Sequence, residues 1–196
     1  MKVEKMKSAF FIVLSTILSF TSLAKDKVDD SVVEDTGRVH ITWESPKKYR
    51  DIRPSNQSRS SFREHVFSEL DEKLETLATD LPEGFTLALV VTNVDLAGNV
   101  SFGGANSSLG RSFGSTVGDI RVIERVFLPR MAFSYQILDG EGNEVLAADK
   151  KIKDTGFLQS SLRRERDRPF VYEKRMLERW YKSEITPHFS EEIAKS

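Results

Sequence analysis

The stretch that decides the fold is residues 61–94, "SFREHVFSELDEKLETLATDLPEGFTLALVVTNV", where a helical pattern is followed directly by a strand pattern. Its first part carries one apolar stripe at helical spacing, formed by Phe62, Val66, Leu70, Leu74, Leu77, Ala78 and Leu81. Ser61 and Glu64 fit a capping box at the start of this helix. Pro82 and Gly84 end it. The sequence therefore predicts an amphipathic helix that packs on a core.

Residues 85–94, "FTLALVVTNV", are apolar or β-branched on both faces, which predicts an interior strand covered on at least one side by that helix. Further strands are predicted at residues 38–43, 119–128, 130–138 and 144–153. The last two are joined as a hairpin by the turn sequence "DGEGN". Residues 169–185 form a second amphipathic pattern. We expect an α+β domain: a mostly antiparallel sheet of about four to five strands, a meander in its second half, and two main helices packed on one face.

The N-terminal residues 1–24 have the order typical of a secretory signal peptide: three lysines, an apolar core and a small-x-small cleavage pattern ending at Ala24. The alternative is an uncleaved membrane anchor, but the apolar core is shorter than the roughly 20 residues that a spanning helix needs. We therefore expect a periplasmic protein that begins at Lys25 and has no membrane span after cleavage. Because the chain has no cysteine, it has neither a disulfide nor an N-terminal lipid.

The remaining chain divides into a flexible acidic leader (25–37), a single domain (38–187) and a C-terminal tail (188–196). Residues 96–119 are predicted to be a long Gly/Ser-rich loop, and loops of this length are either functional or disordered. Lys and Arg total 29 and Asp and Glu 30, so the charges nearly cancel. A nucleic-acid partner has no support in such a composition.

The sequence does not match the motifs of common metal, phosphate or hydrolase sites when the positions are counted. A calcium loop starting at Asn93 has Ala97 and Gly104 where oxygen ligands are required. The stretch "GGANSSLGRS" has the wrong glycine spacing and no lysine for a phosphate loop. The three histidines show no zinc-ligand spacing, and no serine stands in a hydrolase motif. We predict no metal and no cofactor.

Charged and aromatic residues in loops and at element ends are the candidate binding residues. They are Tyr49, Asp51, Arg53, Asp95, Arg130, Asp154, Glu173 and Lys174. An arginine fork suits carboxylate or phosphate groups. The alternative is structural: Asp51, Arg53, Arg130 and Glu173 pair with one another and tie the irregular N-terminal segment to the domain. Asp95 is expected to cap the turn that follows its strand, with Arg130 as the cation that could meet it.

Five segments in order resemble the bacterial envelope family called domain of unknown function 3016. They are "VHITWESPKKYRDIRP" (39–54), "LATDLPEGFTLALVVTNVDLAG" (77–98), "FLPRMAFSYQILDGEGNEVL" (127–146), "KDTGF" (153–157) and "YEKRMLERWY" (172–181). The resemblance implies an exported protein of the periplasm of a Gram-negative bacterium. It implies no known activity, and no catalytic residue can be carried over from it.

These observations favour a non-enzymatic binding or interaction module of the cell envelope, whose partner is an envelope protein, a glycan or a lipid head group. The alternative is a carboxylate-dependent envelope hydrolase that uses Asp51, Asp95 or Asp154. An enzyme would bring at least two of these carboxylates into one concave pocket. A binding module would leave them scattered, each paired with arginine or with backbone N–H groups. A third possibility is an assembly subunit with an exposed apolar patch.

Overall fold

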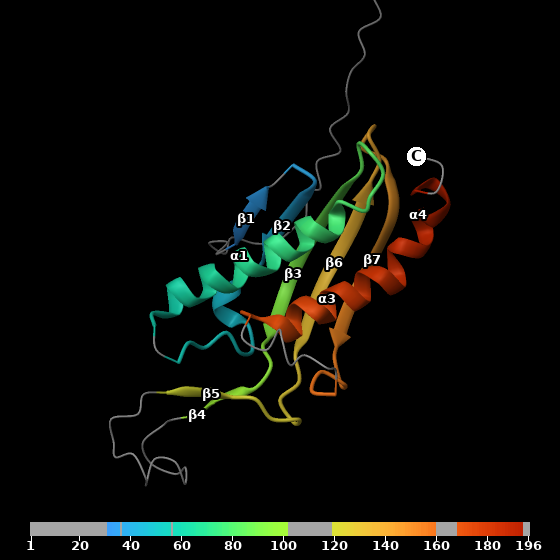
Figure 1. Cartoon of the computed structure of the whole chain (residues 1–196). Coiled ribbons are helices and arrows are strands. Elements are labelled where there is room, and N and C mark those ends of the chain that lie inside the picture. Colours follow the sequence, from blue (N-terminus) through green and yellow to red (C-terminus); the bar gives the residue numbers. More distant parts are fainter. Residues whose placement is uncertain (1–30, 36, 56, 102–118, 160–167, 194–196) are drawn as a thin grey trace, which may run out of the picture.

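The computed structural model describes residues 31–35, 37–55, 57–101, 119–159 and 168–193 (Figure 1). The predicted signal peptide (1–24) lies outside the described residues, as do residues 25–30 of the predicted leader and residues 102–118 of the Gly/Ser-rich loop. Among the helices within the described residues, none is both long enough and apolar enough to cross a membrane.

The first half of the chain forms β1 (Val32–Asp35), β2 (Val39–Trp43), the short 3₁₀ helix η1 (Pro46–Lys48), α1 (Arg59–Ala78) and β3 (Thr86–Asp95). The second half forms β4 (Asn99–Ser101), β5 (Ile120–Val122), β6 (Arg130–Leu138), β7 (Glu144–Lys153), α3 (Val171–Glu184) and α4 (Thr186–Ile193).

Five strands form one sheet in the order β1-β2-β3-β6-β7, and β4 and β5 form a separate two-stranded ribbon. Every neighbouring pair in the large sheet is antiparallel except β2 and β3, which are parallel. A parallel pair needs a long crossover, and η1 and α1 provide it here. The predicted α+β class and the mostly antiparallel sheet are confirmed, and β3 is the central strand of that sheet.

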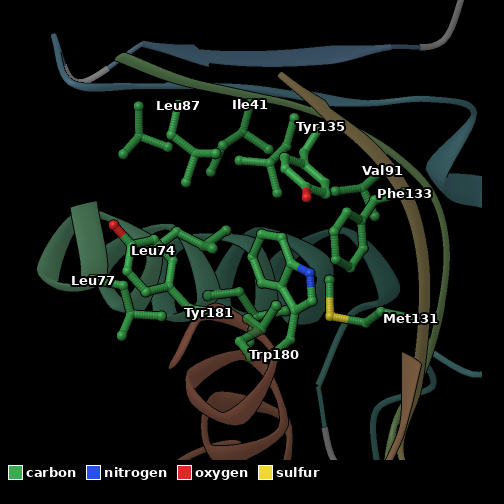
Figure 2. Packing of buried hydrophobic residues seen from close by; sticks show 14 of the residues in the cluster. Ile41, Leu74, Leu77, Leu87, Val91, Met131, Phe133, Tyr135, Trp180 and Tyr181 are labelled. Atoms are coloured by element: carbon green, nitrogen blue, oxygen red, sulfur yellow. The ribbon is translucent and has the colours of Figure 1, made fainter. Parts of the chain in front are cut away.

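Every second residue of β2 is buried, and β6 shows the same alternation along its length. The buried side chains meet those of α1 and α3 in one hydrophobic core. The Trp43 ring stacks on Phe67 of α1 at 4.2 Å between centroids, and Trp180 of α3 meets Phe133 edge-on at 4.8 Å. In Figure 1, α1 and α3 lie next to one another against the sheet. Figure 2 shows their side chains directed toward the strands.

Several local predictions are wrong in detail. The helix α1 begins at Arg59, and its N-cap is Ser58, whose hydroxyl accepts a hydrogen bond from the Ser61 N–H at 3.1 Å. The predicted capping box of Ser61 and Glu64 is therefore not at the start of the helix. The helix begins earlier because Ser58 can already supply the oxygen that a first turn requires.

The predicted meander is also wrong, because β5 has only three residues and pairs with β4 rather than with β6. Pro129 separates β5 from β6, as its missing N–H suggests. The sequence predicts a leader up to residue 37 and a tail from residue 188. The structure instead forms β1 within the first stretch, on the edge of the sheet, and continues α4 through residue 193.

Candidate functional site

A groove of about 870 Å³ lies between α1 and α3. We call it the cationic groove because its lining includes six cationic side chains and two acidic ones. The cationic residues are Lys73, Arg168, Lys174, Arg175, Arg179 and Lys182, and the acidic residues are Glu72 and Glu178. Two further carboxylates, those of Glu69 and Asp154, pair with Lys174 and Arg179. Cations remain in excess when these two are included.

The periodicity of α3 places its charges on one face. Lys174, Arg175, Glu178, Arg179 and Lys182 follow one another at intervals of one and three residues, so they share one side of the helix. The residues between them form the buried side: Met176, Leu177, Trp180 and Tyr181. Packing of this apolar side against the sheet therefore turns the charged side toward the groove.

Glu178 is the main internal counterion of the cationic groove. It accepts hydrogen bonds from Lys182 at 2.6 Å and from Lys73 at 2.9 Å. These bonds lower the pKa of Glu178 to about 2, because they favour the charged carboxylate. They also join α1 to α3. Glu178 therefore stays ionised at neutral pH and neutralises part of the excess.

Arg168 and Arg175 are different, because within the described residues neither has a carboxylate partner. One terminal nitrogen of Arg175 is buried and forms no hydrogen bond with the described part of the chain. A buried guanidinium N–H without an acceptor is unfavourable, and carboxylate or phosphate oxygens match the geometry of its fork. The groove can therefore accept an anionic group at Arg175.

A second cluster surrounds the end of β3, where four of the predicted site residues meet. Asp51 forms an ion pair with Arg121, with 2.9 Å between Oδ2 and Nη1. The same guanidinium donates to the carbonyl oxygens of Arg53 at 2.9 Å and Ala97 at 3.2 Å. Arg121 therefore ties the irregular segment after η1 to the turn after β3. The predicted pairing of Asp51, Arg53, Arg130 and Glu173 with one another is wrong, because the cation that pairs with Asp51 is Arg121 and Glu173 accepts a backbone N–H instead.

Asp95 lies beside this pair, and its backbone forms an isolated parallel β-bridge with the backbone of Asp51. Its carboxylate meets Arg50 at 3.5 Å, and Arg130 stands opposite it in the register of β3 and β6. Burial raises the pKa of Asp95, whereas the charges of Arg50 and Arg130 lower it. Arg130 thus acts on Asp95 through its charge, while the ion pair is made by Arg50.

A pocket of about 350 Å³ is lined by Asp51 and Asp95 together with Arg50, Arg53 and Arg130. Two of the three carboxylates proposed for hydrolysis therefore converge, but each has an arginine partner. Both carboxylates are therefore already engaged in ion pairs.

The other predicted site residues lie elsewhere. Tyr49 is buried, its hydroxyl donates to the Val91 carbonyl at 2.6 Å, and burial raises its pKa. Asp154 is buried, pairs with Arg179 and accepts the Gly156 N–H at 3.0 Å. These contacts hold the fold together.

Glu173 and Lys174 are neighbours on α3 with different roles. Glu173 is only 2% exposed, and its carboxylate accepts the backbone N–H of Ala97 at 2.6 Å. Burial raises the pKa of Glu173, and the Ala97 N–H opposes this effect. Lys174 faces the cationic groove and pairs with Glu69 of α1.

Arg121 and Arg175 are central to these sites but are absent from the predicted site residues, as is Asp71, which is buried in the apolar side of α1. Arg121 and Asp51 are 70 positions apart, and no local pattern joins them. Arg175 lies on the charged face of a helix, where an arginine is ordinary. Asp71 does carry a signal, because it lies four residues after Phe67 and three before Leu74 on the apolar side of α1.

Within the residues that the structure describes, no group of three or more His, Cys, Asp or Glu side chains could hold a metal ion. No curated protein and no solved structure matches this chain. A family model does match: the one described as "Protein of unknown function (DUF3016)", over residues 37–183. This match confirms the family resemblance and covers most of the sequence, so the chain belongs to the DUF3016 family.

Proposed function

We propose that this protein is a non-enzymatic binding module of the bacterial cell envelope and that the cationic groove binds a phosphate-bearing ligand. The observation that carries the proposal is the excess of cations between α1 and α3, with a buried nitrogen of Arg175 left without an acceptor. Phosphate groups of this kind occur on lipid head groups and on envelope glycans. An envelope protein that presents an acidic surface is the alternative partner.

The physical basis is electrostatic complementarity. Lys73, Lys174, Arg179 and Lys182 are held in place by carboxylates, so the groove is organised before a ligand arrives. Among the described residues, Arg168 and Arg175 have no carboxylate partner, so their guanidinium groups remain for a ligand phosphate. Because the groove is open to solvent, we expect the affinity to fall as salt is raised, since the Debye length is about 10 Å at 0.1 M salt.

Binding is tested on residues 25–196 with two probes. Vesicles that contain phosphatidylglycerol present the phosphate on a membrane, and soluble glycerol phosphate presents it alone. We expect the double variant Arg168→Gln/Arg175→Gln to bind at least about tenfold more weakly than the wild type, which is the loss expected for two charge-assisted contacts.

The matched control is Arg125→Gln, which removes an exposed arginine outside the groove. Binding to vesicles but not to glycerol phosphate would identify a membrane ligand, and binding to both would identify the phosphate itself. An equal loss of affinity in Arg125→Gln and in the groove variant would contradict the proposal.

Export to the periplasm is part of the same proposal and is supported by the signal pattern of residues 1–24. We expect N-terminal sequencing of the periplasmic fraction to find a chain that begins at Lys25. An intact Met1 in the membrane fraction would contradict it.

A carboxylate-dependent hydrolase is the second candidate, because Asp51 and Asp95 line one pocket. Purified cell-wall sacculi provide a direct assay. If the protein releases soluble fragments from the sacculi, and Asp51→Asn and Asp95→Asn both abolish this release, the hydrolase hypothesis is correct. The binding proposal predicts no release by the wild type.

A further inference from the structure

A second groove, of about 670 Å³, is lined by α1, β1 and η1. We call it the acidic groove because five carboxylates line it, compared with two cations, Lys47 and Arg63. The carboxylates belong to Glu34, Glu64, Asp71, Glu72 and Glu75. Within the described residues, none of these five forms an ion pair. The acidic groove therefore has the opposite charge to the cationic groove, and α1 contributes to both.

Asp71 distinguishes this groove from an ordinary solvated acidic surface. Its side chain lines the groove but is only 7% exposed, and Oδ1 is buried without a hydrogen-bond partner. The indole N–H of Trp43 faces the carboxyl but also lacks a partner at hydrogen-bonding geometry. A buried carboxyl oxygen without a donor is unfavourable, and the ammonium group of a bound cation would supply a donor.

The charged side chains around Asp71 are mostly acidic, which favours a positively charged ligand. Burial, together with the charges of Glu34 and Glu75, raises the pKa of Asp71 to about 7, while the indole N–H of Trp43 opposes the shift. The other charged groups of the groove are Glu64, Glu72 and Arg63 on α1 and Lys47 on η1. The carboxyl is thus about half protonated at neutral pH, and a cation would convert it to the charged form.

The shape of the lining narrows the class of cation. Val32, Pro46 and Phe67 supply apolar surface between the carboxylates. A metal ion is disfavoured, because the described residues hold no group of three or more acidic or histidine side chains at metal-binding distances. Separated carboxylates with apolar surface between them instead match a chain of methylene groups that carries several ammonium groups.

We propose that the acidic groove binds a small aliphatic polyamine and that Asp71 accepts hydrogen bonds from one of its ammonium groups. The other carboxylates of the groove provide the attraction for the remaining ammonium groups. The linings of the two grooves share only Glu72, and the residues that carry the two proposals, Asp71 and Arg175, differ, so either proposal can fail without the other.

Calorimetry with spermidine as the probe tests the proposal on residues 25–196. We expect binding to release up to about half a proton at neutral pH, because the bound ammonium favours the charged form of a carboxyl whose pKa is about 7. The affinity should therefore rise severalfold between about pH 6 and about pH 8. Titrations in two buffers with different ionisation enthalpies measure the released protons directly.

Asp71→Asn should weaken spermidine binding about tenfold and abolish the proton release, as expected for a lost charge-assisted contact. Because Asp71 is buried, thermal unfolding of this variant checks that it folds. Glu75→Gln, at a less buried position of the same groove, should weaken binding about threefold. Glu83→Gln removes an exposed carboxylate outside the groove and is the matched control, with unchanged affinity.

Three results would overturn the proposal. The first is no spermidine binding by the wild type at millimolar concentration. The second is an unchanged affinity in Asp71→Asn. The third is displacement of spermidine by an equal concentration of magnesium ions, which would identify a site for divalent cations instead.

Discussion

Replacing Asp71 by Asn should make the protein less sensitive to alkaline pH, because the native fold favours the neutral form of this carboxyl. Asp71 lies in the apolar side of α1, and burial raises its pKa from 3.8 to about 7. A carboxyl with a raised native pKa holds its proton more tightly in the folded state than in the unfolded state. Its contribution to stability is therefore retained at low pH and is lost as pH rises from about 4 through about 7.

The size of the effect follows from the shift. Each pKa unit corresponds to about 1.4 kcal/mol, so a rise from 3.8 to about 7 sets an upper limit of roughly 4 kcal/mol. Because Asp71 lines an open groove, water screens part of its charge, and we expect about 2 to 3 kcal/mol. Asn carries no ionisable proton. The free energy of unfolding of Asp71→Asn should therefore rise relative to that of the wild type by this amount between about pH 3 and about pH 8.

Urea unfolding at several pH values measures this difference, and the fluorescence of the buried Trp43 and Trp180 reports on it. Glu64→Gln, at an exposed position of the same helix, is the control, and its difference from the wild type should change less than that of Asp71→Asn because water screens an exposed charge. A difference for Asp71→Asn that stays constant within about 0.5 kcal/mol across this range would refute the reasoning.

Three further predictions concern the fold, and urea unfolding tests each of them. Leu70→Ala should lower the free energy of unfolding by about 2–5 kcal/mol, because Leu70 is fully buried, and a loss below about 1 kcal/mol would place it outside the core. Gly98→Ala should cost roughly 2 kcal/mol more than Gly142→Ala, with equal losses arguing against it. Both glycines have positive φ, but only at Gly98 would a Cβ meet a backbone oxygen of β5, at 2.5 Å. Glu173→Ala should lower the free energy of unfolding by about 1–3 kcal/mol, because it leaves the buried Ala97 N–H without an acceptor. Glu173→Gln keeps an acceptor and should cost less. Equal losses in the two variants would show that the hydrogen bond is unimportant.

The local elements were predictable wherever a short pattern carries the physical cause. The β6–β7 hairpin follows from "DGEGN": the Asp139 carboxylate accepts the N–H groups of Glu141 and Asn143 at 2.9 Å each, and Gly142 adopts a φ of +84°. The central strand β3 is equally clear, because its apolar residues suit burial between two neighbouring strands.

Pairing between distant strands was not predictable in the same way. The parallel direction of β2 and β3 depends on where α1 packs, which no short pattern specifies. The edge strand β1 was missed because its four residues are all exposed, so it has no buried face to produce an alternating pattern. Its formation depends on backbone pairing with β2.

The candidate sites show the same limit. The sequence identifies Asp51 and Asp95 as candidates, but their partners Arg121 and Arg50 become apparent only when the segments meet. The groove between α1 and α3 also needs both helices in place. Asp71 could have been identified as a candidate from the sequence, because a carboxyl in an apolar stripe is unusual. It indicates either a hydrogen-bonded core group or a functional site.

The most direct test of the proposed function is an NMR titration of ¹⁵N-labelled residues 25–196 with glycerol phosphate, followed through the arginine side-chain Nε–H signals. The proposal predicts that the signals of Arg168 and Arg175 move together with the backbone signals of α3, and that this change disappears in Arg168→Gln/Arg175→Gln. Changes confined to Arg121 and Arg50, or none at all, would contradict a phosphate site in the cationic groove.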